Sequence, residues 1–241
     1  MSVSTISEGE IHLWQITLDD PLVNPDNLYN EVLSEDEKER ASWFRFSEYR
    51  SKFITARGHL RKILGRYLKT RPEEIVFAYN EYGKPGIPAG SNRQKINFNL
   101  SHSRDIALCA IAADYEVGID IEYVRRVMRS EKILERFFSP GETEYYHSCP
   151  ANMRERAFMT LWTMKEAYSK AVGTGFTSNL KELDLSPALT GTSPSRVSVP
   201  RGDGMEKWSI YTFTPFNEYA ASLALKGEAH GVSYFPADFT E

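Results

Sequence analysis

The order of the predicted elements constrains this fold more than any other feature, because helices precede a run of short strands twice along the chain. In the first half, an opening strand is predicted at residues 10–18, and helical patterning then extends from Ser34 to about Lys69, with a break near Phe46. Pro72 ends the helical region. Apolar segments that follow predict strands at 75–80, 96–103, 106–113 and 117–124.

The second half repeats this order. Helices are predicted over 130–147, with an interruption near Ser139, and over 154–172, which Gly173 ends. Strand patterns follow at 180–185, 195–199, 207–214, 219–226 and 231–235, and residues 186–204 are predicted to form a hairpin excursion. The segment IALCAIAA of the first half matches YAASLALK of the second in position and pattern. We therefore predict an α+β fold of two similar halves, residues 1–122 and 123–241, each a long helix packed on a small antiparallel sheet.

The charge balance and the cysteine content restrict the class of protein. Twenty-nine Lys and Arg against 33 Asp and Glu give a net charge of −4, which is too acidic for a general nucleic-acid coat, so any anion site must be local. The two cysteines, Cys109 and Cys149, indicate a reducing compartment without a disulfide framework. The N-terminus resembles no signal peptide, and no window approaches the ~18 apolar residues of a membrane span. We expect a cytoplasmic protein with neither nucleic acid nor membrane as a partner.

One segment of this acidic chain is strongly basic. Residues 45–71 contain nine Lys or Arg and a single acid, Glu48. On a helix, Arg50, Arg57 and Arg61 fall within ~40° of one another. Their guanidiniums suit a phosphate, since each offers a planar pair of donors, but a solvated basic face also explains the pattern.

Carboxylates with suitable spacing for a metal occur on a predicted strand and a predicted helix. Asp120 and Glu122 alternate with apolar residues, so they share one face of their strand, about 6.6 Å apart. Mg²⁺ is usually held by one or two carboxylates, with water and substrate phosphate as further ligands. Glu166 is the candidate third carboxylate, four residues before Lys170. Each feature taken alone is also typical of an exposed polar face or of an exposed ion pair.

The segment FNLSHS ends a predicted strand in hydroxyls and an imidazole, where Ser101 and His102 are either surface residues or phosphate contacts. The sequence contains no Walker A loop, GxGxxG turn, HExxH, GxSxG or Cys/His metal spacing, so the common P-loop NTPase, dinucleotide-binding, zinc-protease and serine-hydrolase classes are excluded. Metal and phosphate chemistry remains.

Five segments together resemble the successive motifs of the 4'-phosphopantetheinyl transferase superfamily, in its long, Sfp-type branch. They are GKP (83–85), FNLSHS (98–103), GIDIE (118–122), FFSPGE (137–142) and LWTMKEAYSKAVGTG (161–175). The resemblance covers about residues 10–226. It implies transfer of the 4'-phosphopantetheine arm of coenzyme A to a serine of an apo acyl or peptidyl carrier protein, with release of adenosine 3',5'-bisphosphate. It also implies a fold of two similar α+β halves with coenzyme A between them. The first half is expected to bind most of coenzyme A, and the second to carry the metal-binding and catalytic helix and to dock the carrier protein.

The same resemblance assigns the metal site and the catalytic groups. Asp120, Glu122 and Glu166 are expected to hold Mg²⁺, for which Mn²⁺ is an acceptable substitute, against the diphosphate of coenzyme A. Glu166 is also the expected base for the carrier serine, and Lys170 is expected on the diphosphate. Glu142 is expected as a further catalytic carboxylate, since it keeps the motif spacing that Glu144 does not.

Coenzyme A is expected to contact Lys84, Ser101 and His102 by the same resemblance, with Arg40 and Arg57 as looser assignments for its 3'-phosphate. The tract YVRRVMRS after GIDIE carries three arginines, Arg125, Arg126 and Arg129, which either face an acidic carrier protein or form a solvated turn.

Two other functions use the same residues. A Mg²⁺-dependent hydrolase of nucleotide diphosphates would activate water instead of serine, and a non-catalytic module would only bind coenzyme A or a carrier protein. We expect a monomeric enzyme.

Overall fold

Helices and strands follow the predicted order. The computed structural model of the 241-residue chain describes residues 5–175, 178–190, 195–201, 204–228 and 230–237. The first half comprises β1 (Glu10–Thr17), α1 (Pro25–Glu31), α2 (Glu35–Ser42), α3 (Ser47–Leu68), β2 (Ala78–Tyr79), β3 (Pro85–Gly86), β4 (Ile96–Ser103) and β5 (Ile106–Ala113). The second comprises β6 (Val117–Tyr123), α4 (Ser130–Phe137), α5 (Pro140–Ser148), α6 (Arg154–Val172), α7 (Pro187–Thr190), β7 (Ser195–Arg201), β8 (Gly204–Phe213), β9 (Tyr219–Lys226) and β10 (Gly231–Pro236).

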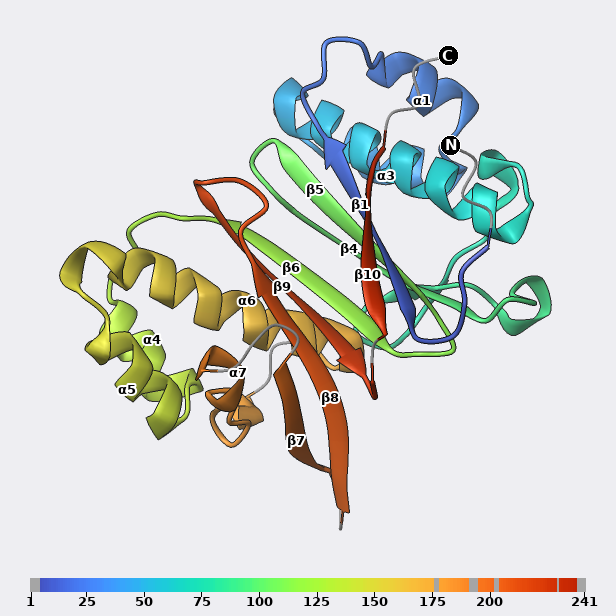
Figure 1. The fold of residues 1–241 in the computed structure, drawn as a ribbon. Helices are drawn as coiled ribbons and strands as arrows, with labels where there is room; N and C mark the ends of the chain where they lie inside the picture. The colour runs from blue at the N-terminus through green and yellow to red at the C-terminus, as the bar shows by residue number, and fades with distance from the viewer. Residues whose placement is uncertain (1–4, 176–177, 191–194, 202–203, 229, 238–241) are drawn as a thin grey trace.

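Two four-stranded sheets form the centre of this α+β fold. Their strand orders are β10-β1-β5-β4 and β6-β9-β8-β7. Apolar side chains of β1 and β5 pack against those of β6 and β9 between the sheets. The long helix α3 covers the outer face of the first sheet, and α6 covers the outer face of the second (Figure 1). The result is a layered order of helix, sheet, sheet and helix.

Each long helix is amphipathic and has a defined end. The buried face of α3 packs Leu60, Ile63 and Leu64 on the first sheet. Lys69, with φ 54°, ends this helix in a left-handed conformation, and Gly173, with φ 79°, ends α6 in the same way. Glycine adopts this conformation without the steric cost of a Cβ atom.

The edge strands β4 and β6 meet where the two sheets join. The amide of Ile119 donates to Asn99 Oδ1 at 2.9 Å, and the amide of Tyr123 donates to Ser103 Oγ at 3.0 Å. Side chains of β4 thereby bind the backbone of β6, so the polar residues of both strands lie close together. This junction positions the candidate site.

One predicted strand is much shorter in the structure, and another is wrong. Residues 75–80 contain only the short strand β2, after a 3₁₀ turn at Pro72–Glu74, and residues 180–185 form no strand after a 3₁₀ turn at Ser178–Lys181. At both segments a buried cation of the preceding long helix binds backbone carbonyls within the predicted strand or just before it. Arg61 donates to the carbonyls of Pro72 and Ile75, and Lys165 donates to those of Leu180 and Leu183.

The other strands and the long helices agree with the prediction to within a few residues. The predicted hairpin excursion corresponds to α7, β7 and the start of β8, although residues 191–194 and 202–203 lie outside the described residues. The first sheet is not the purely antiparallel sheet predicted for each half, because β10 of the second half pairs with β1 in parallel at its edge. The strand β6, at whose end the predicted boundary falls, pairs with β9. No helix in the described ranges is long and apolar enough to cross a membrane.

Candidate active site

Asp120 and Glu122 of β6 lie beside the hydroxyls of β4. Asp120 Oδ1 accepts a hydrogen bond from Ser101 Oγ at 2.8 Å, and Glu122 Oε2 accepts one from Ser103 Oγ at 3.1 Å. The two carboxylates share one face of the strand, as the alternating pattern predicts. Gly118, on that same face, brings β6 against the backbone of α6.

Lys170 of α6 completes a polar triangle with Asp120 and Ser101. Its Nζ lies 2.5 Å from Asp120 Oδ1 and 2.9 Å from Ser101 Oγ. Asp120 is only 3% exposed, and its second oxygen, Oδ2, is buried without a hydrogen-bond partner among the described residues. A buried carboxylate oxygen of this kind is costly unless a cation or donor satisfies it.

Three carboxylates share the electrostatic field of this site. Burial raises the pKa of Asp120, and Lys170 opposes that shift. Burial and then the charge of Asp120 raise the pKa of Glu122. Burial and Asp120 also raise the pKa of Glu166, which lies one helical turn before Lys170. The three groups are therefore close enough to repel one another when ionised.

The donor set suits a hard divalent cation. Carboxylate oxygens are the ligands that Mg²⁺ prefers, and Asp120 Oδ2 is an available one. Across the described ranges, however, three or more His, Cys, Asp or Glu side chains do not converge into a ready metal cluster. The expected trio of Asp120, Glu122 and Glu166 is thus close enough for the charges to interact, but the three carboxylates do not converge on one point. Lys170 binds the other oxygen of Asp120.

Ser101 and His102 lie on opposite faces of β4. Ser101 pairs in register with Leu108, which faces the second sheet, whereas His102 pairs with Ala107, which faces α3. Desolvation lowers the pKa of His102, and the Lys170 ammonium lowers it further. The FNLSHS segment therefore presents its hydroxyls to the carboxylates and its imidazole to the basic helix.

Lys84 lies against the C-terminal end of α6. Its Nζ donates to the carbonyl of Ala171 at 2.8 Å and to that of Val117 at 3.4 Å, while Asn80 Nδ2 donates to the carbonyl of Gly173 at 2.9 Å. Burial lowers the pKa of Lys84 to about 8. The GKP loop of the first half thus binds the last turn of α6.

The arginines of α3 are paired within the protein. Glu37 of α2 is 2% exposed and binds both Arg57, at 2.5 Å, and the buried Arg61. The Arg57 guanidinium also lies 4.8 Å from the centre of the Phe77 ring. Arg40 is exposed, with its guanidinium 5.6 Å from the centre of the Phe53 ring. The predicted cluster of three free guanidiniums is therefore divided by a buried carboxylate.

Glu142 occupies a similar interior position in the second half. It is 1% exposed, and Oε2 accepts hydrogen bonds from the Ser139 amide at 2.8 Å and from Lys165 Nζ at 2.9 Å. Its other oxygen accepts from the amide of Leu185 at 2.9 Å. Glu144 is exposed. The contacts of Glu142 tie α5 and the segment after α6 to Lys165, the neighbour of Glu166.

Sequence reasoning missed three residues that hold this arrangement: Ser103, Lys165 and Glu37. Ser103 had a signal, because it shares a strand face with Ser101 in an alternating segment. Lys165 and Glu37 lack one, since a lysine beside Glu166 and a capping-box glutamate are typical of exposed positions. Only their burial reveals them.

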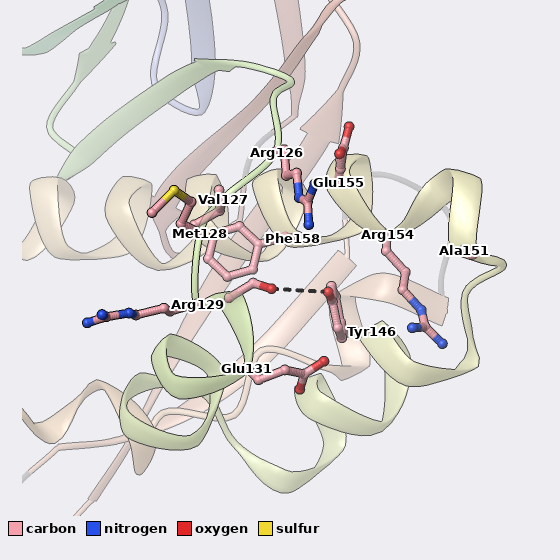
Figure 2. A pocket seen from close by; sticks show the side chains of 11 residues that line it. Arg126, Val127, Met128, Arg129, Glu131, Tyr146, Ala151, Arg154, Glu155 and Phe158 are labelled. Carbon is pink, nitrogen blue, oxygen red and sulfur yellow. Dashed lines mark hydrogen bonds between the residues drawn. The ribbon is translucent and has the colours of Figure 1, made fainter.

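The tract after β6 borders two cavities. One, of about 440 Å³, lies between this tract, α5 and α6 (Figure 2). The hydroxyls of Ser130 and Tyr146, which both line it, lie 3.4 Å apart. The other, of about 190 Å³, is lined by Glu122, Arg125 and Trp162 among others. The smaller cavity gives the carboxylate site an opening toward the arginine tract.

Two family models match consecutive parts of the chain. The model of the 4'-phosphopantetheinyl transferase superfamily matches residues 116–224, and the model of the 4'-phosphopantetheinyl transferase N-terminal region matches residues 22–115. The two matches meet just before β6. They include every predicted site residue.

Similar curated proteins are named as phosphopantetheinyl transferases. The 4'-phosphopantetheinyl transferase HetI of Nostoc sp. is 38% identical over 223 residues, which are 92% of this chain and 90% of that protein. The 4'-phosphopantetheinyl transferase Sfp of Bacillus subtilis is 30% identical, over 72% of this chain and 75% of its own. An L-aminoadipate-semialdehyde dehydrogenase-phosphopantetheinyl transferase of Xenopus laevis is 26% identical over 79% of this chain and 67% of its own. The chain therefore belongs to the 4'-phosphopantetheinyl transferase superfamily, in its Sfp-type branch, and is a transferase.

Proposed function

We propose that this protein transfers the 4'-phosphopantetheine group of coenzyme A to a serine of an apo acyl or peptidyl carrier protein. One observation carries the proposal within the family. Asp120 is buried beside Glu122, Glu166 and Lys170, and its Oδ2 lacks a partner among the described residues. A site with concentrated negative charge, one vacant oxygen and one adjacent ammonium suits a diphosphate bound through a divalent cation.

Each group has a separate part in this proposal. Asp120, Glu122 and Glu166 would hold Mg²⁺, or Mn²⁺ in its place. When bound, the ion would neutralise charge on the diphosphate and on the transferring phosphoryl group. Lys170 forms an ion pair with Asp120 and contacts Ser101 in the structure. In this proposal it exchanges one of these two contacts for a diphosphate oxygen. Glu166, with its raised pKa, is the base that accepts the proton of the carrier serine.

Glu142 contributes through Lys165 in this proposal. Its oxygens bind Lys165 and two backbone amides, so it is a positioning residue that fixes α6 next to Glu166. Lys84 likewise binds the end of α6, and in this proposal it contacts coenzyme A from that position.

The first half would bind the nucleotide end of coenzyme A. Ser101 adjoins the carboxylate site, and His102 lies on the α3 face of β4, near the basic helix. Arg57 is the proposed 3'-phosphate contact from α3, and Arg40 is the exposed alternative on α2. Pairing with Glu37 holds the Arg57 side chain in place before a ligand binds.

We also propose that the two halves arose as copies of one unit. Three strands of each sheet follow the same order, β1-β5-β4 and β6-β9-β8, with antiparallel pairing throughout. In each half, a buried capping-box glutamate pairs with a buried cation of the long helix, and that cation binds two carbonyls of the next segment. The pairs are Glu37 with Arg61 and Glu142 with Lys165.

The deciding experiment mixes the purified protein, as a monomer, with coenzyme A, Mg²⁺ and several apo carrier proteins, and then measures intact mass. Transfer adds one phosphopantetheine to the carrier and releases adenosine 3',5'-bisphosphate. EDTA should stop the reaction, and Mg²⁺ or Mn²⁺ should restore it. Cleavage of coenzyme A without carrier modification would instead identify a hydrolase, and binding without turnover would identify a non-catalytic module.

A further inference from the structure

Exposed aromatic side chains gather where α2 leads into α3. Trp43, Phe46 and Tyr49 are 72%, 60% and 58% exposed. Phe46 and Tyr49 contact each other edge to face, with ring centres 6.1 Å apart. Exposed aromatics so close together are costly in water and mark interaction surfaces. We call Trp43, Phe46 and Tyr49, with Arg45 and Arg50, the aromatic corner.

The charges of the aromatic corner are positive. The Arg45 guanidinium lies 5.7 Å from the centre of the Phe46 ring, and that of Arg50 lies 4.9 Å from the centre of the Tyr29 ring. In the described part of the chain, neither arginine forms an ion pair with a carboxylate, whereas Glu48 between them pairs with Lys52 at 2.6 Å. The corner therefore presents apolar rings beside two cations whose charge is not neutralised.

A short series of contacts connects the aromatic corner to the carboxylate site. Lys52, one helical turn after Tyr49, lies 2.8 Å from Asp105 in the turn between β4 and β5. In the same turn, the Arg104 guanidinium stacks 3.2 Å from the centre of the Tyr123 ring. Tyr123 directly follows Glu122 in the sequence. In Figure 1, the start of α3, the β4–β5 turn and the tract after β6 lie on the same side of the molecule. The aromatic corner therefore lies on the same side of the molecule as the tract that follows Glu122 (Figure 1).

We propose that the aromatic corner is a docking surface for an acidic, amphipathic helix of the macromolecular substrate. This inference rests on the proposed function, in which that substrate is a carrier protein. Apolar side chains of such a helix would cover Trp43 and Phe46, and its carboxylates would bind Arg45 and Arg50. A second copy of this chain fits less well, because a two-fold contact would bring the same arginines against each other.

The test compares surface variants in carrier modification and in direct binding. Trp43→Ser with Phe46→Ser should raise the KM for apo carrier protein about tenfold, while kcat and the KM for coenzyme A stay at wild-type values. Arg45→Glu should also raise the carrier KM, and this effect should shrink between 50 and 300 mM salt. Leu22→Ser with Met205→Ser, at exposed apolar positions elsewhere, and Arg196→Glu on β7 are the matched controls.

Direct binding separates the possible failures. Anisotropy of a labelled apo carrier should give a Kd that rises in parallel with KM. A carrier KM and Kd that match those of the control variants would overturn the docking surface alone. Absence of any carrier binding or modification by the wild type would overturn the proposed function as well. If the aromatic-corner variants lose cosedimentation with phosphatidylglycerol vesicles while their carrier kinetics stay unchanged, the corner binds a membrane and the proposal is overturned.

Discussion

Gly118 of β6 lies so close to Ala167 of α6 that a Cβ atom on the glycine would stand 2.1 Å from the Ala167 carbonyl oxygen and 2.4 Å from the Ala171 amide nitrogen. Backbone meets backbone at this point, so the clash cannot be relieved by a side chain turning away. This contact sets the distance between the strand that carries Asp120 and the helix that carries Lys170.

Gly118→Ala should therefore separate the helix from the strand. We expect a loss of ~1–3 kcal/mol in the free energy of unfolding, measured with urea. We also expect the folded variant to lose transfer activity, because Asp120 and Lys170 are moved apart. Gly90→Ala is the control, because a Cβ atom there meets nothing within 4 Å. Wild-type activity in Gly118→Ala would show that the helix can shift without consequence for the site.

Asp120→Asn and Glu166→Gln should each reduce kcat by about a hundredfold or more, because each removes a charge that would hold the cation. Both side chains face polar surroundings, so neither change leaves an apolar cavity. Intact-mass assays at saturating Mg²⁺ measure the rate, and circular dichroism checks the fold. Glu73→Gln, in the exposed turn after α3, is the control. Near-normal turnover by either purified variant would refute the metal assignment.

The Glu142 and Lys165 pair should be costly to break from either side. Glu142→Gln or Lys165→Met leaves an uncompensated buried charge, for which we expect a loss of ~3–5 kcal/mol in unfolding free energy. The double variant should lose less than the two single losses added together. Glu35→Gln, which breaks an exposed pair with Lys38, should cost under about 1 kcal/mol. Additive losses would mean that the two side chains do not stabilise each other.

Lys84 should make stability depend on pH. Burial lowers its folded-state pKa to about 8 from the ordinary lysine value of 10.5, so between these two pH values the unfolded chain binds more protons. The free energy of unfolding should therefore rise from pH 8 to 10 in the wild type, relative to Lys84→Met. Lys95→Met is the comparison, because Asp114 raises the pKa of that exposed lysine out of this range. Parallel pH profiles for the wild type and Lys84→Met would contradict the shift.

Arg57→Ala should weaken binding of coenzyme A more than binding of its 3'-dephospho analogue. A charge-assisted phosphate contact contributes ~1.5–3 kcal/mol, or about ten- to a hundredfold in affinity. Calorimetry with both ligands measures the difference, and Arg71→Ala, at the exposed end of the basic segment, is the control. An equal loss for the two ligands would restrict Arg57 to its ion pair with Glu37.

Local sequence determined most of the secondary structure and the face of the strand that carries the carboxylates. Alternation placed Asp120 and Glu122 together, and helical spacing placed Lys170 one turn after Glu166, because both depend on fixed backbone geometry. The motif order was sufficient for the family. Segments 75–80 and 180–185 were beyond local reasoning, since carbonyls within them bind Arg61 and Lys165 of the preceding long helices.

Tertiary structure alone decided which charged side chains are paired and which are buried. The sequence shows nine cations against one acid around α3, yet Glu37 from another helix forms ion pairs with both Arg57 and Arg61. Likewise, Asp120 is a metal candidate in the sequence, but only the packing of α6 on β6 brings Lys170 to one oxygen and leaves the other buried and unpartnered. Burial and pairing depend on contacts between distant segments, and a pattern of neighbouring residues does not encode them.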